Sequence, residues 1–144
     1  MNPEDTVHLL KECDAGVKMA IASFDEVIGK VKAPELLKLL EKNKEEHIAY
    51  ETECHNRLIV EGEEDKNPNP MAKAMSYMKI NMKMLPEPTD HEIAELIFDG
   101  CNMGVKSLFK YLHQYKAASE EAKKLTEDII TSEESLRESL KEYV

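Results

Sequence analysis

Apolar residues recur at steps of three and four along most of the chain, which is the period of an amphipathic α-helix. Four long segments show this pattern, over residues 3–31, 34–61, 90–116 and 119–143. Representative apolar positions are Leu10, Phe24, Leu36, Leu58, Ile97, Leu108, Leu125 and Leu140. No segment alternates apolar and polar residues with the two-residue period of a strand. The pattern therefore predicts an all-α protein built on four long helices.

Residues that favour helix starts precede these segments. Asn2 and Pro3 open the first one, as a capping side chain followed by proline at the first helical position. Thr89 and Glu92 have the spacing of a capping box, and Ser119 is a suitable cap for the last helix. Because the connections within each pair of segments are short, we expect two antiparallel helical hairpins.

A longer connection separates the two hairpins. It contains a predicted helix over residues 70–85, whose methionines recur at steps of four, three and four: Met71, Met75, Met78 and Met82. Two hairpins joined by one long crossover are a known topology of four-helix bundles. We therefore expect a single four-helix-bundle domain over residues 1–144, with a short extra helix in the crossover.

A short motif occurs once in each predicted hairpin. Residues 13–18 read Cys-Asp-Ala-Gly-Val-Lys, and residues 101–106 read Cys-Asn-Met-Gly-Val-Lys. A glycine within a helix costs about 1 kcal/mol relative to alanine, so its presence at both sites suggests a purpose. The motif predicts an internal repeat in which Gly16 and Gly104 mark the points where two helices approach each other closely.

Composition and charge narrow the class of protein. The chain has 144 residues, of which 42% are hydrophobic and 33% charged, as in globular proteins. A net charge of -10 argues against binding to nucleic acid or to anionic lipid, because both need clustered Lys and Arg. Three cysteines within helical patterns fit reduced thiols, and neither a membrane span nor a signal peptide is recognisable. We therefore expect a cytoplasmic protein.

Polar residues interrupt the predicted buried faces near the middle of the bundle. We call them the polar layer: Asp14, His47, Glu51, Asn102 and Glu133. Carboxylate and imidazole groups are ligands for iron and zinc, so one hypothesis is a metal site in this layer. The layer contains no Cys-x-x-Cys or His-Glu-x-x-His spacing. The main expectation is therefore a bundle without a cofactor.

A hydrogen-bonded network is the other interpretation of the polar layer. Buried polar groups need partners because an unpaired one is costly, and a paired layer can fix the register of the helices. The possible pairs are Lys44 with Glu133 or Asp14, and His47 with Asn102 or Ser132.

Three short segments resemble a known family. They are residues 81–83 (Asn-Met-Lys), residues 90–91 (Asp-His) and residues 101–104 (Cys-Asn-Met-Gly). They are similar to segments of a bacterial four-helix-bundle family of unknown function, which belongs to the ferritin-like superfamily together with the rubrerythrins. The resemblance covers nearly the whole chain. It implies a ferritin-like fold with two hairpins and a long crossover.

The resemblance also implies where a di-iron site would lie. Such a site takes a carboxylate from each of two helices and a Glu-x-x-His pair from each of the other two. Asp14 and Asn102 occupy the positions of the two single carboxylates, and Lys44 stands where the Glu before His47 should be. The last helix has no histidine near Glu133. We therefore do not expect an oxygen-activating di-iron centre.

The methionine stripe in the crossover has three interpretations. It is the buried face of the crossover helix, a Cu(I) site, or a contact surface for a partner or a second copy of the chain. The sequence has no Gly-rich phosphate loop and no nucleophile that can be matched with a base. We therefore predict a non-catalytic bundle that acts by self-association, as a dimer, or by partner binding. The alternative is a ferritin-like protein that still binds iron or zinc at the polar layer.

Overall fold

The computed structural model describes residues 2–63 and 87–144, and the described part of the chain is helical with no strand. The elements are α1 (Pro3–Ile28), α2 (Pro34–Val60), α4 (Asp90–Gln114), α5 (Glu120–Leu140) and the short 3-10 helix η1 (Lys141–Tyr143). The predicted all-α class is thus confirmed. The predicted crossover helix at 70–85 and its methionine stripe lie outside the described residues.

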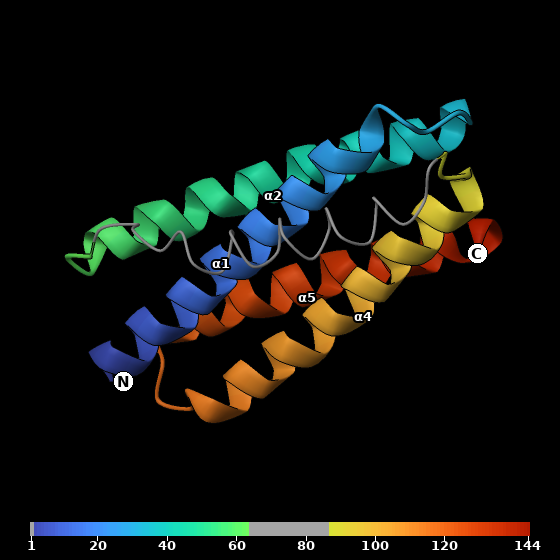
Figure 1. Ribbon diagram of the computed structural model, residues 1–144. Helices are drawn as coiled ribbons and strands as arrows, with labels where there is room; N and C mark the ends of the chain where they lie inside the picture. The colour runs from blue at the N-terminus through green and yellow to red at the C-terminus, as the bar shows by residue number, and fades with distance from the viewer. Residues whose placement is uncertain (1, 64–86) are drawn as a thin grey trace.

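The helices form two antiparallel hairpins that pack side by side as a bundle. Figure 1 shows α1 paired with α2 and α4 paired with α5, with the N-terminus and the C-terminus at opposite ends of the molecule. Helix α1 also contacts both α4 and α5, so it joins the two hairpins. The described residues therefore form the helical bundle of two antiparallel hairpins that the sequence predicts. None of the described helices has the length and apolar character that crossing a membrane requires.

The predicted helix starts are confirmed in detail. The Oδ1 of Asn2 accepts a hydrogen bond of 2.9 Å from the backbone N–H of Glu4. Thr89 and Glu92 form both bonds of a capping box, and the Oγ of Ser119 caps α5. The first helix ends at Ile28, three residues before the predicted end, because the chain turns at Gly29.

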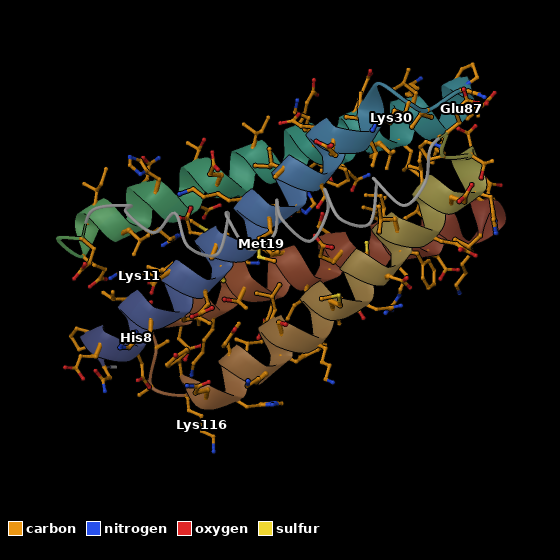
Figure 2. All side chains as sticks on the ribbon, viewed as in Figure 1. His8, Lys11, Met19, Lys30, Glu87 and Lys116 are labelled. Atoms are coloured by element: carbon orange, nitrogen blue, oxygen red, sulfur yellow. The ribbon has the colours of Figure 1, made fainter. Side chains whose placement is uncertain are left out.

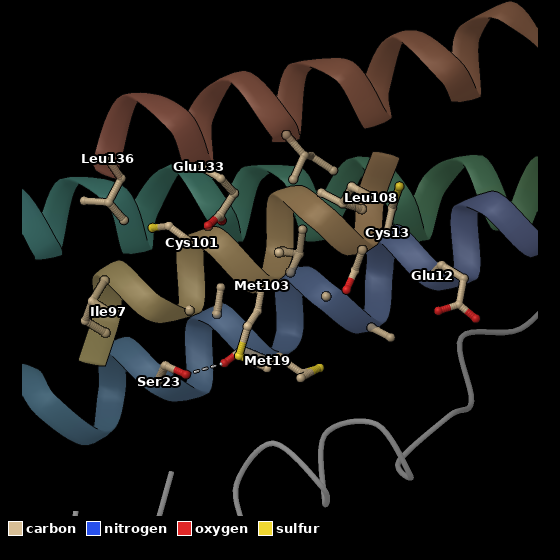
Figure 3. A pocket seen from close by; sticks show the side chains of 18 of the residues that line it. Glu12, Cys13, Met19, Ser23, Ile97, Cys101, Met103, Leu108, Glu133 and Leu136 are labelled. Carbon is tan, nitrogen blue, oxygen red and sulfur yellow. Dashed lines mark hydrogen bonds between the residues drawn. The ribbon is translucent and has the colours of Figure 1, made fainter. Parts of the chain in front are cut away.

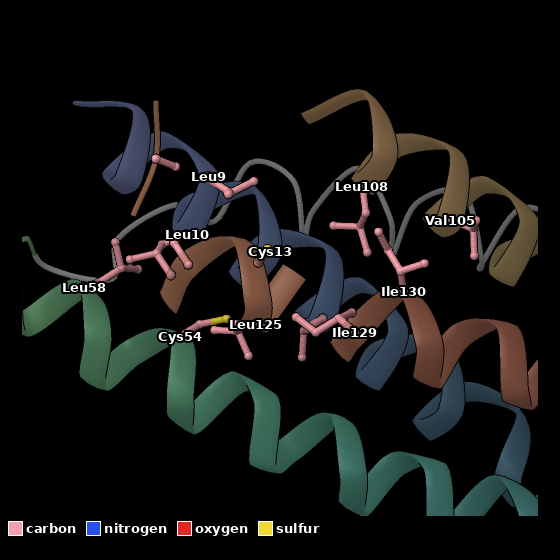
Figure 4. Close-up of a cluster of buried hydrophobic side chains, with 13 residues drawn as sticks. Leu9, Leu10, Cys13, Cys54, Leu58, Val105, Leu108, Leu125, Ile129 and Ile130 are labelled. Atoms are coloured by element: carbon pink, nitrogen blue, oxygen red, sulfur yellow. The ribbon is translucent and has the colours of Figure 1, made fainter. Parts of the chain in front are cut away.

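The buried apolar side chains form two clusters, one toward each end of the bundle. One cluster, drawn in Figure 4, includes Leu9, Leu10, Cys54, Leu58, Leu125 and Ile129. The other includes Phe24, Leu36, Leu40, Ile93, Leu136 and Leu140. Between them lies His47, whose ring is 5.3 Å from that of Phe24 and 6.2 Å from that of Tyr50, centroid to centroid. The polar centre of the bundle is therefore enclosed by apolar residues on both sides.

Both hairpins are tied together by hydrogen bonds at their ends. The carboxylate of Asp90, at the start of α4, accepts bonds from the backbone N–H groups of Lys32 and Ala33, at 2.9 and 2.8 Å. At the other end, the backbone N–H of Ser119 donates to the hydroxyl of Thr6 at 2.8 Å. These contacts fix the connection between α1 and α2 against α4, and α1 against the start of α5.

Candidate functional site

A buried pair of His47 and Glu133 occupies the centre of the bundle. His47 is 0% exposed, and its Nε2 lies 2.5 Å from Oε1 of Glu133. Its Nδ1 lies 2.7 Å from the backbone carbonyl oxygen of Asn43. The carbonyl can only accept, so Nδ1 donates to it. With the Glu133 carboxylate ionised, Nε2 donates as well and the ring is an imidazolium ion. The pair therefore joins α2 to α5 by a charged hydrogen bond.

Opposing influences act on the pKa of His47. Burial lowers the pKa, because it disfavours the charged ring. The hydrogen bond and negative charge of Glu133 raise it, with smaller contributions from the carbonyl of Asn43 and the charge of Glu46. The net result is a pKa above the ordinary histidine value. The raised pKa favours the charged ring, and this charge state agrees with the two hydrogen bonds that the ring makes.

The structure brings together only two of the five polar-layer residues, His47 and Glu133. Asp14 is buried and forms an ion pair of 2.8 Å with Lys18, one turn along the same helix. Asn102 faces solvent, where its Oδ1 accepts a bond of 2.8 Å from Arg137. Glu51 is partly buried on α2, one turn beyond His47. Within the described ranges, no three His, Cys, Asp or Glu residues are grouped as a metal site requires.

The predicted hydrogen-bonded network has different members from those that were expected. Lys44 forms an ion pair with Asp25 at the surface, rather than with Glu133 or Asp14. His47 bonds Glu133 and the carbonyl of Asn43, rather than Asn102 or Ser132. Lys44 lies three residues before His47 on an adjoining part of the same face of α2, and its side chain extends to Asp25 of α1 while that of His47 extends to Glu133 of α5. A paired polar core is present, but its partners differ from those predicted.

An apolar groove of about 630 Å³ runs between α1 and α4, with α5 behind it. Its walls carry the same pattern of residues twice, in the order Gly-x-x-Met-x-x-x-Ser. The α1 wall contributes Gly16, Met19 and Ser23, and the α4 wall contributes Gly100, Met103 and Ser107. Met19 lies near the middle of α1 (Figure 2), and Figure 3 shows it on the opposite side of the groove from Cys101.

Glycine leaves room along this groove, which corrects the prediction of a close helix crossing. A Cβ atom added at Gly16 would meet nothing within 4 Å. At Gly104 it would lie 3.7 Å from Oε2 of Glu133, which is an ordinary contact. The two glycines therefore face open space or a side chain, rather than the backbone of a neighbouring helix.

Glu133 connects the buried pair with the groove. Figure 3 shows its side chain pointing from α5 toward α4, with the carboxylate beside Cys101. Burial, reinforced by the charge of Glu133 and a hydrogen bond to it, raises the pKa of the Cys101 thiol well above its usual value. The protonated thiol therefore donates to the carboxylate. Glu133 lines the groove while remaining 7% exposed.

Comparisons of the chain with protein-family models, curated proteins and solved structures find no match. The class that the fold and site define is a helical bundle with an apolar groove above a buried charged pair. The ferritin-like assignment and the internal repeat remain predictions.

Sequence reasoning did not identify the groove. Its lining combines residues of the predicted buried faces, such as Phe24 and Leu108, with smaller residues beside them, such as Ala15 and Gly100. The period of apolar residues predicts which face of a helix is apolar, but not whether another helix covers it or a space lies against it. The repeated Cys-x-x-Gly motif was the available signal, because Gly16 and Gly104 both line the groove. What the sequence could not show is the side of each helix on which the space lies.

Proposed function

We propose that this chain is a non-catalytic binding protein that holds an elongated apolar small molecule in the groove between α1 and α4. The volume of about 630 Å³ supports this role, because small-molecule sites in proteins occupy about 300–1,000 Å³. Such sites are mostly apolar with a few placed polar groups. The groove has this composition. This role differs from the partner binding predicted from the sequence, which was to a protein or a second copy of the chain at the methionine stripe.

The shape of the groove favours a long and narrow ligand. On α1 the lining runs from Glu12 to Phe24, and on α4 it runs from Leu96 to Tyr111. At 1.5 Å per residue, these stretches are about 18 Å and 22 Å long. A molecule with an extended hydrocarbon or flat aromatic body would bury its apolar surface along this length.

The chemistry of the buried groups supports binding rather than catalysis. The raised pKa of His47 favours the imidazolium form, which has no lone pair with which to act as a base. Burial raises the pKa of the Cys13 thiol to about 12, and burial likewise raises the pKa of Cys101. These thiols stay protonated at neutral pH and are weak nucleophiles.

Fluorescence titration with N-phenyl-1-naphthylamine, an uncharged apolar probe, tests the proposal. We expect saturable binding by the full chain and displacement of the probe by 1-octanol. Gly16→Phe should abolish binding, because the new ring can enter the groove without meeting a neighbouring atom at its Cβ. Gly29→Phe is the matched control, since Gly29 lies outside the groove and also has open space beside it.

Two results would contradict the proposal. One is equal probe binding by the wild type and the Gly16→Phe variant, which would place the probe elsewhere. The other is binding that arises only when the methionines at 71, 75, 78 and 82 are changed to serine. That result would mean that the chain itself fills the groove.

The predictions of a dimer and of a metal site, which were made from the sequence, are tested by separate experiments. Self-association as a dimer is measured by light scattering during size-exclusion chromatography. Binding of iron or zinc at the polar layer is measured by elemental analysis of protein purified without chelators, with His47→Ala as the variant that should lose the metal.

A further inference from the structure

We propose that Glu133 selects the ligand of this groove, and that the preferred class is an uncharged apolar molecule with an O–H or N–H donor. This inference rests on the proposed function, because it names the chemistry of the molecule that the groove takes. It is carried by the position of the Glu133 carboxylate, which belongs both to the buried pair and to the lining of the groove.

The Glu133 carboxylate has acceptor capacity to spare. An ionised carboxylate can accept about four hydrogen bonds. Oε1 accepts one from His47, and the thiol of Cys101 donates another. Oε2 lies on the side of Gly104, where no side chain separates it from the α4 wall. A donor on a ligand can therefore reach a strong acceptor at the inner side of the groove.

Charge balance makes an uncharged ligand the best match. The imidazolium of His47 already compensates the negative charge of Glu133. A ligand with an ammonium group would add a buried positive charge without a new partner, which is costly. A ligand with a carboxylate would likewise add a buried charge without a new partner. The described residues that line the groove include no Lys or Arg that could pair with such an anion.

Two isomeric ligands test the requirement for a donor. 1-Octanol and 1-methoxyheptane have the same atoms and nearly the same size, but only the alcohol can donate a hydrogen bond. We expect the wild-type protein to bind the alcohol at least about tenfold more tightly, because a bond to a charged acceptor is then made. Octylammonium and octanoate should both bind more weakly than the alcohol.

A double variant, His47→Leu with Glu133→Leu, supplies the matched control. It removes both charges together, which avoids leaving one of them buried and unpaired. We expect it to bind the two isomers with equal affinity, because the apolar walls remain and the acceptor does not. A tenfold preference that persists in this variant would assign selection to another group and overturn the inference.

The outcomes also separate this inference from the proposed function. If neither isomer binds to the wild type, the groove is not a ligand site and both proposals fail. If both isomers bind equally, the groove is a ligand site but Glu133 does not select the ligand. A second measurement needs no variant: the ¹³C signal of the Glu133 carboxylate should shift with 1-octanol and stay in place with 1-methoxyheptane. The reverse, or no difference, overturns the inference.

Discussion

Replacing His47 with leucine should destabilise the protein severely, because it leaves the carboxylate of Glu133 buried without its partner. The histidine is 0% exposed, and the side chain of Glu133 is 10% exposed. Removing one partner from a buried ion pair costs about 3–5 kcal/mol. Since a domain has a free energy of unfolding of about 5–15 kcal/mol, this single substitution removes a large part of that free energy.

Replacing both partners with leucine should restore most of the loss. Apolar replacement of a whole buried pair is often neutral or stabilising, because no charge then needs to be desolvated. The double variant His47→Leu/Glu133→Leu should therefore be more stable than His47→Leu by about 3 kcal/mol or more. His55→Leu, at an exposed position on the same helix, is the control, and it should change stability by less than about 0.5 kcal/mol.

Protonation of His47 makes the stability of the wild-type protein depend on pH. The opposing effects of burial, which lowers the pKa, and of Glu133, which raises it, leave the folded-state pKa above the ordinary value. The stability contributed by the charged ring is fully present below the unfolded-state pKa of about 6.5. It is lost as the pH rises through the folded-state pKa. The wild type should therefore lose stability relative to the double variant above neutral pH.

Urea unfolding followed by circular dichroism at several pH values between 6 and 9 measures both effects. The double-mutant cycle isolates the pair, because the other titrating groups are common to all variants. Additive losses for the two single variants His47→Leu and Glu133→Leu would refute the account of the pair. So would a wild-type stability that follows the double variant at every pH.

Three further predictions concern the groove, the hairpin ends and the thiols. Gly16→Ala should stabilise the protein by about 0.5–1 kcal/mol in urea unfolding, because a Cβ there meets no neighbour and alanine favours the helix. Asp90→Ala should lower the free energy of unfolding by about 1–3 kcal/mol, measured the same way. The substitution removes the hydrogen bonds that the Asp90 carboxylate accepts from the backbone N–H groups of Lys32 and Ala33. Cys13 and Cys101 are buried and have raised pKa values, so they should react with a thiol reagent at pH 8 far more slowly than an exposed cysteine does. Rapid reaction in the native state would contradict the last of these.

The helices and their starts could be predicted because they depend on local sequence. The step of three and four marks each buried face, and Asn2, Thr89 and Ser119 act on N–H groups within their own first turn. These signals need no knowledge of where the other helices lie. They located the starts of the four helices closely, whereas α1 ends at Ile28 and α5 at Leu140, each three residues before the predicted end.

The partners of the polar residues could not be predicted, because they depend on how two hairpins align. His47 and Glu133 are 86 residues apart, so a small rotation of α5 would bring a different residue to His47. Lys44 shows the same limit, since its ion pair with Asp25 depends on the way in which α1 crosses α2. The groove was missed for a related reason. Gly16 is compatible with both a tight crossing and an open space.

The glycine signals of a ¹H–¹⁵N correlation spectrum, recorded while 1-octanol is added, test the central claim most directly. The chain has 5 glycines, and all of them lie in the described residues. Gly16, Gly100 and Gly104 line the groove, whereas Gly29 and Gly62 do not. A ligand held between α1 and α4 should shift the first three signals in a saturable manner and leave the other two in place. No shift at all five, or equal shifts at all five, would contradict the assignment of this groove as a binding site.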